Sequence, residues 1–348
     1  MVELSIEEFV FDAPTPRHAS SSLSSALKTV AKRYRSSSNR SDEDDTGITL
    51  LLVHGTGFHK EQWEPTIQAI FNHYATPGSS ERTKVKEMWS FDWHDHGAAA
   101  VINREALRAR GDRGGSLREL GGAIAAFVKS DHVKGHTLVS VSHSLGSAAM
   151  LFSTNLFPVH EIPYHTLIFV DPTMCREEFW HQNLHTRKGL FDYGALATGS
   201  ARRRDRWTSK EEAFSWFSNR FPWKTWDIRA VRSFVDHALE QKDEYVGLKC
   251  NKLHESEYYS PSENIFDPPH IISKLCHAVP IHIIWGEIPD IMPTIARNSF
   301  HDLQVASVSV VKRCGHLVIA QQPDSLAQSI CKKLDATPFK QQTMEAKL

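Results

Sequence analysis

The chain has 348 residues, which is enough for one sizeable core and an inserted subdomain. Its 40 Lys and Arg residues nearly balance 41 Asp and Glu residues, so the formal net charge is −1 and we expect no nucleic-acid partner. No apolar run approaches the roughly 18 residues that a bilayer-spanning helix needs, so we expect no membrane span either.

The first elements along the chain are two strands. Residues 27–34 are interpreted as an early edge strand, followed by a polar linker. Residues 48–53 form an unbroken apolar run, which favours a buried parallel strand.

The strand at 48–53 leads into His54-Gly55-Thr56-Gly57-Phe58. Glycines let such a loop approach a substrate carbonyl, and we expect the Thr56 N–H to be one donor of an oxyanion hole. His54, Gly55, Gly57 and Phe58 are predicted to border the substrate pocket. The alternative is an ordinary Gly-rich strand-to-helix loop.

Residues 86–97 contain two Asp and two His residues close together: Asp92, His94, Asp95 and His96. These four side chains could be interpreted as the ligands of a metal ion. Alternating positions in one loop rarely close a metal site, so we expect no metal and no other cofactor. The five Cys residues show no zinc or redox spacing and are interpreted as reduced thiols.

The segment Ser142-His143-Ser144-Leu145-Gly146 follows a strand-like run at 137–142 and precedes a run that can begin a helix. Small residues two positions before and after a serine, between a strand and a helix, are typical of a nucleophile elbow. This frame predicts Ser144 as the nucleophile and the Leu145 N–H as the second oxyanion donor. His143 is predicted to border the pocket.

Two later strands, 279–285 and 305–311, lead to Gly286…Asp290 and to Gly315-His316. They predict the order Ser144…Asp290…His316, in which the imidazole takes the serine proton and the carboxylate holds the imidazole. The acid has alternatives. Asp171 ends a strand at 166–170, and Glu287 lies near Asp290. Asp290 is preferred, although three residues separate it from Gly286 where two are usual.

More than a hundred residues lie between Asp171 and the strand at 279–285, far more than a loop needs. We expect a helical cap at 173–275 between core segments 1–172 and 276–335. The aromatic run at 211–226 is predicted to be helical on either side of Pro222, and Trp216 is expected to line the substrate pocket.

These motifs resemble the α/β-hydrolase superfamily over about residues 45–335, in its serine-nucleophile form with a cap. The resemblance implies an α/β fold with a mostly parallel sheet between helices. With the ending Ala346-Lys347-Leu348, which fits a peroxisomal import signal, the chain is similar to fungal peroxisomal hydrolases of the yeast lipase type and of host-selective toxin biosynthesis. We therefore expect a peroxisomal location, an import receptor that binds this tripeptide, and a polar tail at 336–348.

The resemblance implies hydrolysis of an ester or thioester with an apolar acyl group, through an acyl-enzyme. Acyl transfer or a lyase reaction on the same three residues remains open. A non-catalytic protein of this fold that binds a small molecule is the alternative outside enzymes.

Overall fold

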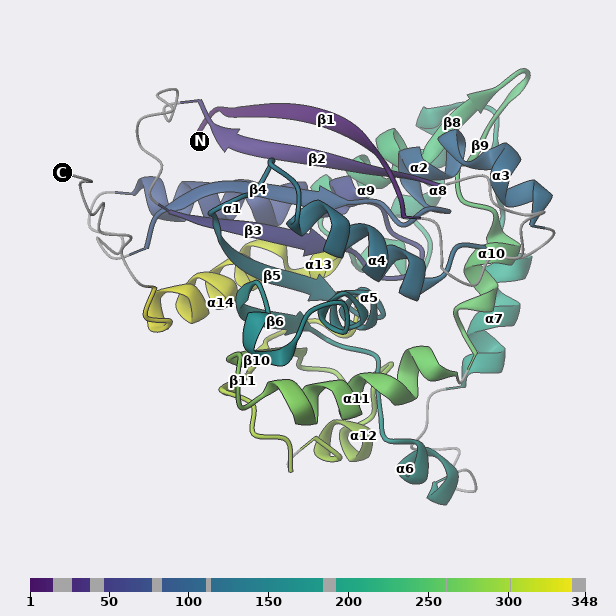
Figure 1. The fold of residues 1–348 in the computed structure, drawn as a ribbon. Helices are drawn as coiled ribbons and strands as arrows, with labels where there is room; N and C mark the ends of the chain where they lie inside the picture. The colour runs from purple at the N-terminus through teal and green to yellow at the C-terminus, as the bar shows by residue number, and fades with distance from the viewer. Residues whose placement is uncertain are drawn as a thin grey trace.

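The computed structural model describes residues 1–14, 27–37, 47–76, 83–110, 114–183, 192–260, 262–300 and 302–339. Its centre is an eight-stranded sheet in the order β1-β2-β4-β3-β5-β6-β10-β11 (Figure 1). β1 pairs antiparallel with β2, and β2 with β4, whereas the remaining neighbours are parallel. The strands are β1 (Leu4–Asp12), β2 (Lys28–Ser36), β3 (Ile48–Val53), β4 (Val85–Phe91), β5 (Thr137–His143), β6 (Tyr164–Val170), β10 (Ile281–Gly286) and β11 (Ser307–Val311).

The segment predicted as an edge strand is β2, and it is not at the edge. β1 pairs with β2 from Leu4 opposite Ser36 to Asp12 opposite Lys28 and so forms the outer strand. The polar linker predicted after it lies mostly outside the described residues.

Helices cover both faces of the sheet, because side chains of the parallel strands alternate between the faces. In β3, Leu51 and Val53 belong to the apolar cluster on one face, and Leu50 and Leu52 belong to the cluster on the other. The first face is covered by α4 (Leu117–Val128), α5 (Gly146–Thr154), α11 (Glu263–Leu275) and α12 (Thr294–Asn298). The second is covered by α1 (Glu64–Ala75), α13 (Val318–Gln321) and α14 (Pro323–Ala336). This arrangement confirms the predicted fold class.

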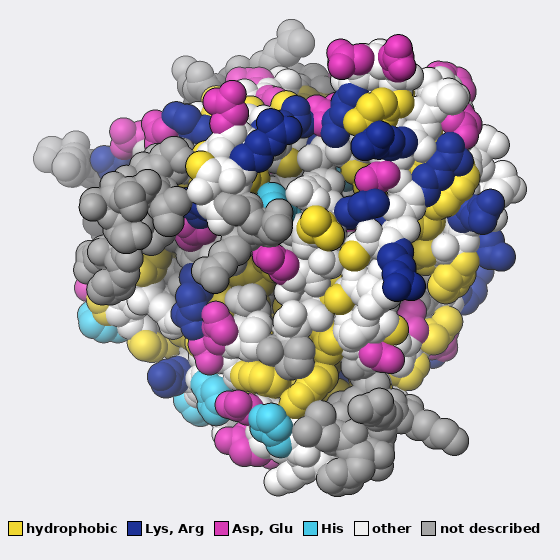
Figure 2. All heavy atoms as spheres, turned by 90° about the vertical axis from the view of Figure 1, so that its right-hand side faces the viewer, with side chains coloured by type: hydrophobic (Ala, Val, Ile, Leu, Met, Phe, Trp, Pro, Cys, Tyr) yellow, Lys and Arg dark blue, Asp and Glu magenta, His cyan; other side chains and the backbone are white. Residues whose placement is uncertain are grey.

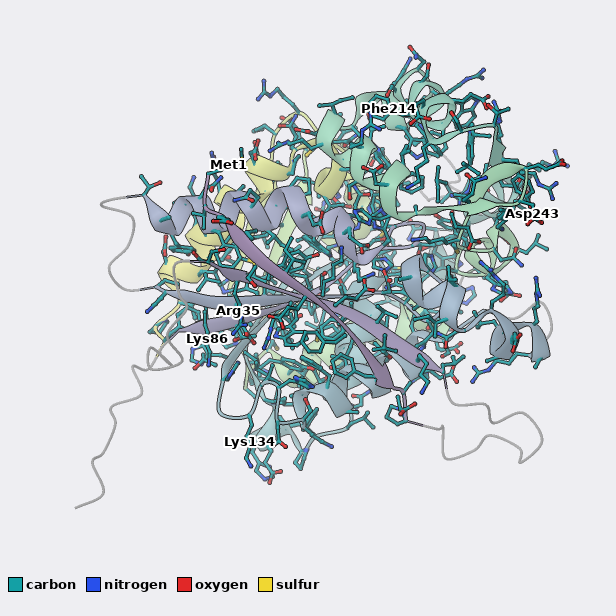
Figure 3. The ribbon with its side chains drawn as sticks, turned by 90° about the horizontal axis from the view of Figure 1, so that it is seen from above. Met1, Arg35, Lys86, Lys134, Phe214 and Asp243 are labelled. Carbon is teal, nitrogen blue, oxygen red and sulfur yellow. The ribbon has the colours of Figure 1, made fainter. Side chains whose placement is uncertain are left out.

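An insertion between β6 and β10 stands beyond the carboxyl ends of the parallel strands, to which the arrowheads of β3 and β5 point in Figure 1. Its first five α-helices are α6 (Glu177–Gln182), α7 (Tyr193–Arg202), α8 (Lys210–Ser218), α9 (Ile228–His237) and α10 (Lys252–Glu257). It also contains a three-stranded antiparallel sheet of β7 (Arg206–Trp207), β9 (Tyr245–Leu248) and β8 (Leu239–Lys242). In Figure 3, Phe214 and Asp243 mark this insertion, well away from Lys86 and Lys134.

The interval expected to be a helical cap thus differs from the prediction in two ways. It includes the small sheet just described, which packs with α8 and α9 around Trp207, Phe217 and Phe234. Its last helix, α11, contributes Ile265 and Ile272 to the cluster beneath the main sheet. The burial of α11 against α5 therefore makes it part of the core packing.

Two short helices, α2 (Gly97–Ile102) and α3 (Arg104–Ala109), follow β4 and lie beside the insertion. Figure 2 shows the face that they share with the insertion, where Lys and Arg side chains gather in the upper right. Among the described residues, no helix combines the length and the apolar composition needed to cross a membrane.

Candidate active site

The predicted sharp turn is formed at Ser144. β5 ends at His143 and α5 begins at Gly146, which leaves Ser144 in the left-handed region with φ of 54°. A non-glycine residue there is strained and is typical of functional turns. A Cβ at position 146 would lie 2.3 Å from the His54 carbonyl oxygen, so this position requires glycine. The turn is thereby held against the loop that follows β3.

A continuous hydrogen-bonded chain joins three side chains at this turn. The Nε2 atom of His316 lies 2.8 Å from Ser144 Oγ, and its Nδ1 lies 2.8 Å from Oδ1 of Asp171. Since the carboxylate accepts from Nδ1–H, the neutral imidazole presents the lone pair of Nε2 to the serine hydroxyl. All three side chains are buried.

The expected pairing of Asp290 with the imidazole is wrong. Asp290 is exposed, and its Oδ1 accepts a hydrogen bond from the backbone N–H of His316 at 2.8 Å. Asp171 takes the imidazole because β6, which precedes it, lies between β5 and β10 in the sheet. The carboxyl end of β6 is therefore next to Ser144, whereas Asp290 lies four residues beyond the end of β10.

Two further contacts fix the Asp171 carboxylate. Its Oδ2 accepts from the Gly286 amide at 2.7 Å and from the Arg297 guanidinium at 3.2 Å. Glu287, the other alternative acid, is exposed and is held by Lys312 at 2.9 Å and by the Arg313 amide at 2.8 Å. These bonds lower the pKa of the Glu287 carboxyl and keep it away from His316.

His143 holds the backbone of His316 from the opposite side. Its Nε2 donates to the His316 carbonyl oxygen at 2.8 Å, while Asp290 accepts from the His316 amide. Burial, with repulsion from His316, lowers the pKa of His143 to about 3, so this imidazole is neutral. Both the amide and the carbonyl group of His316 are thus hydrogen-bonded, which holds its loop in place.

The loop after β3 lies directly against the Ser144 turn. A Cβ at Gly55 would be 2.7 Å from the Cβ of Ser144, so the approach requires glycine. Gly57 has φ of +77°, and its amide donates to His96 Nε2 at 3.1 Å. That amide is therefore already bonded within the protein.

His54 has a structural role in this loop, because both of its ring nitrogens are hydrogen-bonded to backbone groups. Its Nδ1 donates to the Gly55 carbonyl oxygen at 2.8 Å, and its Nε2 accepts from the Trp93 amide at 3.3 Å. Burial lowers its pKa well below the ordinary value, which keeps the ring neutral.

A cavity of about 420 Å³ opens above Ser144. Of the residues predicted to border the pocket, Gly57, Phe58 and His143 line the cavity, whereas His54, Gly55 and Trp216 do not. The two predicted oxyanion donors, Thr56 and Leu145, also line it. Trp216 packs inside the insertion, with its ring 5.6 Å from that of Trp207 and 5.5 Å from that of Trp223. Further apolar and aromatic residues of the wall are Tyr193, Leu196, Phe221, Pro222, Trp223, Trp226, Phe234, Tyr259, Ile291 and Leu317.

The cavity wall also contains polar side chains that were not anticipated from the sequence, among them Thr173, Arg203 and Glu255. Thr173 places its Oγ1 3.0 Å from Ser144 Oγ. Arg203 donates to Glu255 with both terminal nitrogens, at 2.8 and 2.5 Å. Of these residues only Thr173 had a signal in the sequence, because it lies two residues after Asp171, which directly follows a predicted strand.

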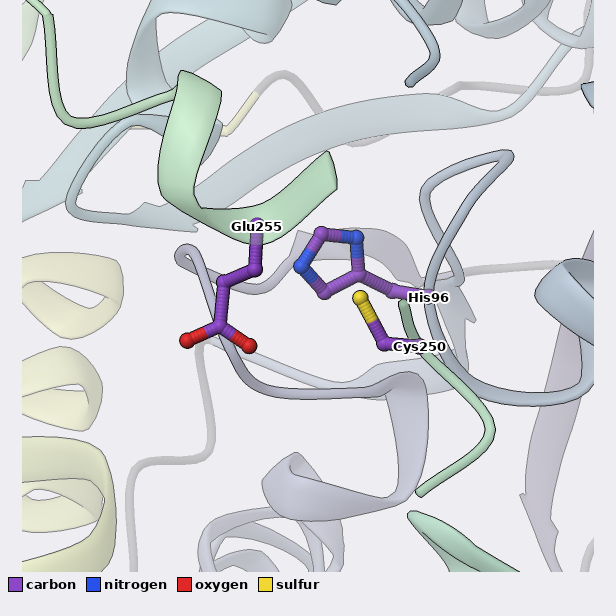
Figure 4. Close-up of side chains that lie close together, drawn as sticks. All are labelled: His96, Cys250 and Glu255. Carbon is purple, nitrogen blue, oxygen red and sulfur yellow. The ribbon is translucent and has the colours of Figure 1, made fainter. Parts of the chain in front are cut away.

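The residues considered for a metal cluster are engaged in hydrogen bonds with protein groups. Asp92 accepts from Lys60, His94 bonds Thr29, and Asp95 bonds His96. A different group, His96, Cys250 and Glu255, has ligand atoms within 4.8 Å of one another (Figure 4). Its donors are already engaged, since Glu255 holds Arg203 and His96 Nε2 accepts the Gly57 amide. This set does not fit a metal ion and instead supports the loop at Gly57.

A family model described as the alpha/beta hydrolase family matches residues 50–329, which is more than half of the chain. The chain therefore belongs to the alpha/beta hydrolase family. No curated protein matches the chain in sequence.

Solved structures share the fold at low sequence identity. The peroxisomal alpha-beta-hydrolase Lpx1 of Saccharomyces cerevisiae is 17% identical with a TM-score of 0.73, over 97% of this chain and 91% of that one. A Mycobacterium tuberculosis esterase is 14% identical with a TM-score of 0.61, over 95% and 92%. The thioesterase domain from the curacin biosynthetic pathway is 11% identical with a TM-score of 0.62, over 94% and 99%.

Proposed function

We propose that this hydrolase cleaves an ester or thioester of an apolar acyl group, with Ser144 as nucleophile, His316 as general base and Asp171 as the acid that orients it. The observation that carries the proposal is the unbroken pair of 2.8 Å contacts from Asp171 through His316 to Ser144. A serine hydroxyl is a weak nucleophile until an adjacent base accepts its proton, and this geometry supplies that base.

In the first half-reaction, Ser144 Oγ attacks the carbonyl carbon while its proton passes to His316 Nε2. Asp171 stabilises the resulting imidazolium through Nδ1. The imidazolium then donates its proton to the departing alkoxide or thiolate, which leaves an acyl group on Ser144. A water molecule repeats the sequence with His316 as base and releases the acid.

The negative charge that develops on the carbonyl oxygen needs donors beside Ser144. The N–H of Leu145 lies at the start of α5, where the helix dipole favours negative charge. The N–H of Thr56, on the loop pressed against the Ser144 turn, is the second donor that we propose. The Gly57 amide is excluded from this role because His96 accepts it.

The acyl group would occupy the aromatic part of the cavity. Trp223, Trp226 and Phe234 from the insertion face Phe58 from the core, with the ring centroids of Phe58 and Trp226 5.3 Å apart. Burial of acyl methylenes against these rings would stabilise the complex by about 0.8 kcal/mol for each methylene group. The esterase and thioesterase neighbours of this fold support the same class of bond.

A fluorophosphonate probe tests the nucleophile. The wild-type protein should be labelled rapidly on Ser144, whereas Ser144→Ala should not be labelled although it retains the fold by circular dichroism. Labelling of the Ala variant at the wild-type rate would reject Ser144 as the nucleophile. Thr173→Ala provides a matched control, because it removes a neighbouring hydroxyl but leaves the nucleophile in place.

We also propose that the enzyme is peroxisomal. The support is the ending Ala346-Lys347-Leu348, which lies outside the described residues, and the fold shared with a peroxisomal yeast hydrolase. A fluorescent protein fused to the amino terminus should co-localise with a peroxisomal marker, and removal of Leu348 should disperse it. Co-localisation that survives this removal would reject the tripeptide as the signal.

A further inference from the structure

A second cavity, of about 300 Å³, lies between α3 and the insertion and shares no lining residue with the cavity above Ser144. We propose that it binds a small molecule with two phosphate groups, of the nucleoside diphosphate class. This inference goes beyond the proposed hydrolysis and does not rest on it.

The charge of the cavity wall is strongly positive. Two carboxylates, Asp95 and Asp205, line it, whereas its cationic side chains number six: Arg104, Arg108, Arg206, Lys242, Lys249 and Lys252. The whole chain carries a formal net charge of −1, so the cations are concentrated on this face (Figure 2). A concave wall of one sign attracts and retains ligands of the opposite sign.

The neighbouring carboxylates neutralise only part of this charge. Asp95 is fully buried and is committed to His96 at 2.7 Å and to Tyr258 at 2.9 Å. Asp205 pairs with Lys252 at 3.1 Å. Glu240, just outside the wall, lies 3.3 Å from Lys242 and also pairs with Arg104.

Three cations remain without a carboxylate partner among the residues that the structure describes: Arg108, Arg206 and Lys249. Lys249 is half-buried, and burial, with repulsion from Lys60 and Lys210, lowers the pKa of its ammonium despite attraction by Glu61 and Asp92. A bound phosphate would offset this cost, since phosphate oxygens accept charge-assisted hydrogen bonds.

The cations lie on two opposing elements, which favours two phosphates over one. Arg104 and Arg108 belong to α3 of the core, whereas Arg206 and Lys242 belong to the small sheet of the insertion. The ion pair of Arg104 with Glu240 shows that side chains reach across this gap. A diphosphate could therefore contact both walls at once.

The remaining wall suits a nucleoside. Leu107, Leu248 and Leu253 line the cavity together with Tyr245, whose ring lies 4.7 Å from the guanidinium carbon of Arg206. An aromatic ring and apolar side chains beside phosphate-binding cations can hold the flat face of a base. Inorganic phosphate alone would leave this part of the wall unused.

Isothermal titration calorimetry with ADP as the probe tests the proposal on the full chain. We expect saturable binding to the wild type, and binding at least about tenfold weaker to Arg108→Gln/Arg206→Gln and to the triple variant that adds Lys249→Gln. The double variant changes only exposed side chains, so we expect it to fold. It therefore keeps the test valid even where the triple variant, which also replaces the half-buried Lys249, does not fold. The matched control, Lys134→Gln, removes one exposed cation far from this cavity and should bind ADP as the wild type does.

Three ligand comparisons complete the test. Adenosine and inorganic phosphate should each bind at least about tenfold more weakly than ADP, because each engages one part of the wall. Ser144→Ala should bind ADP normally, which separates this site from the hydrolytic one. The proposal is overturned if ADP shows no saturable binding, if the double variant binds it like the wild type, or if inorganic phosphate binds as tightly as ADP.

Discussion

Asp171 and His316 are separated by 145 positions in the chain, yet the carboxylate Oδ1 of one lies 2.8 Å from the imidazole Nδ1 of the other. The Asp171 carboxylate is fully buried, and its second oxygen is held by the Gly286 amide. It therefore cannot rotate away without losing both bonds. This relationship decides which tautomer His316 presents to Ser144.

The first prediction compares the two acids. Asp171→Asn should lower kcat by about 10⁴-fold, because the amide no longer enforces the productive tautomer, whereas Asp290→Asn should lower it by less than about tenfold. Hydrolysis of a chromogenic short-chain ester by both variants provides the measurement. Equal losses in the two variants would contradict the assignment of Asp171 as the acid.

The second prediction concerns the Thr173 hydroxyl, which lies 3.0 Å from Ser144 Oγ. Thr173→Val should lower kcat by about tenfold, the equivalent of one lost hydrogen bond, with little change in KM. Thr173→Ser keeps the hydroxyl and should restore most of the rate. A Val variant as fast as the Ser variant would show that the hydroxyl does not contribute to the rate.

The third prediction separates pocket residues from packing residues among the tryptophans. Trp226→Ala removes part of the cavity wall and should raise KM more for long acyl esters than for short ones. Trp216→Phe, inside the insertion, should leave the preference for chain length unchanged. A chain-length series of p-nitrophenyl esters measures both. A shift in chain-length preference for Trp216→Phe, with none for Trp226→Ala, would mean that Trp216 and not Trp226 lines the substrate pocket.

The fourth prediction concerns the buried Lys60, which lies 3.0 Å from Asp92 and 2.9 Å from Glu61. Burial disfavours its ammonium, but attraction by these carboxylates outweighs burial and raises its pKa. Lys60→Met should reduce the free energy of unfolding by about 3–5 kcal/mol, because buried carboxylates lose their partner. Urea denaturation provides the measurement, with exposed Lys312→Met as a control expected to change stability by less than about 0.5 kcal/mol.

The fifth prediction is an acid-side loss of stability from His94. Burial lowers its pKa from 6.5 to about 4, so below pH 6.5 the unfolded chain binds a proton that the folded chain does not. The free energy of unfolding should therefore fall as the pH decreases from about 6.5 to 4, by up to about 1.4 kcal/mol per pH unit for this residue. His94→Gln should make that slope shallower in urea titrations at several pH values. An unchanged slope would show that His94 does not contribute.

Much of the core was predictable because its signals are local. The apolar run at 48–53 corresponds to β3, and the run before Ser144 corresponds to β5. Small residues around Ser144 allow one sharp turn between a strand and a helix, so the motif itself specifies the backbone. β1 was missed because its exposed and half-buried side chains give only a weak pattern on an outer strand.

The sequence by itself determined most strands of the sheet other than β1, the serine turn and the histidine after the last strand, because each depends on neighbours within a few positions. Only the tertiary structure decided that Asp171 rather than Asp290 meets His316, since strand order in the sheet places β6 beside β5. It likewise decided that Trp226, not Trp216, lines the cavity, and it brought the cations of α3 and the insertion together. Such contacts depend on how elements that are distant in the chain pack together, and this packing cannot be predicted from the spacing of residues along the chain.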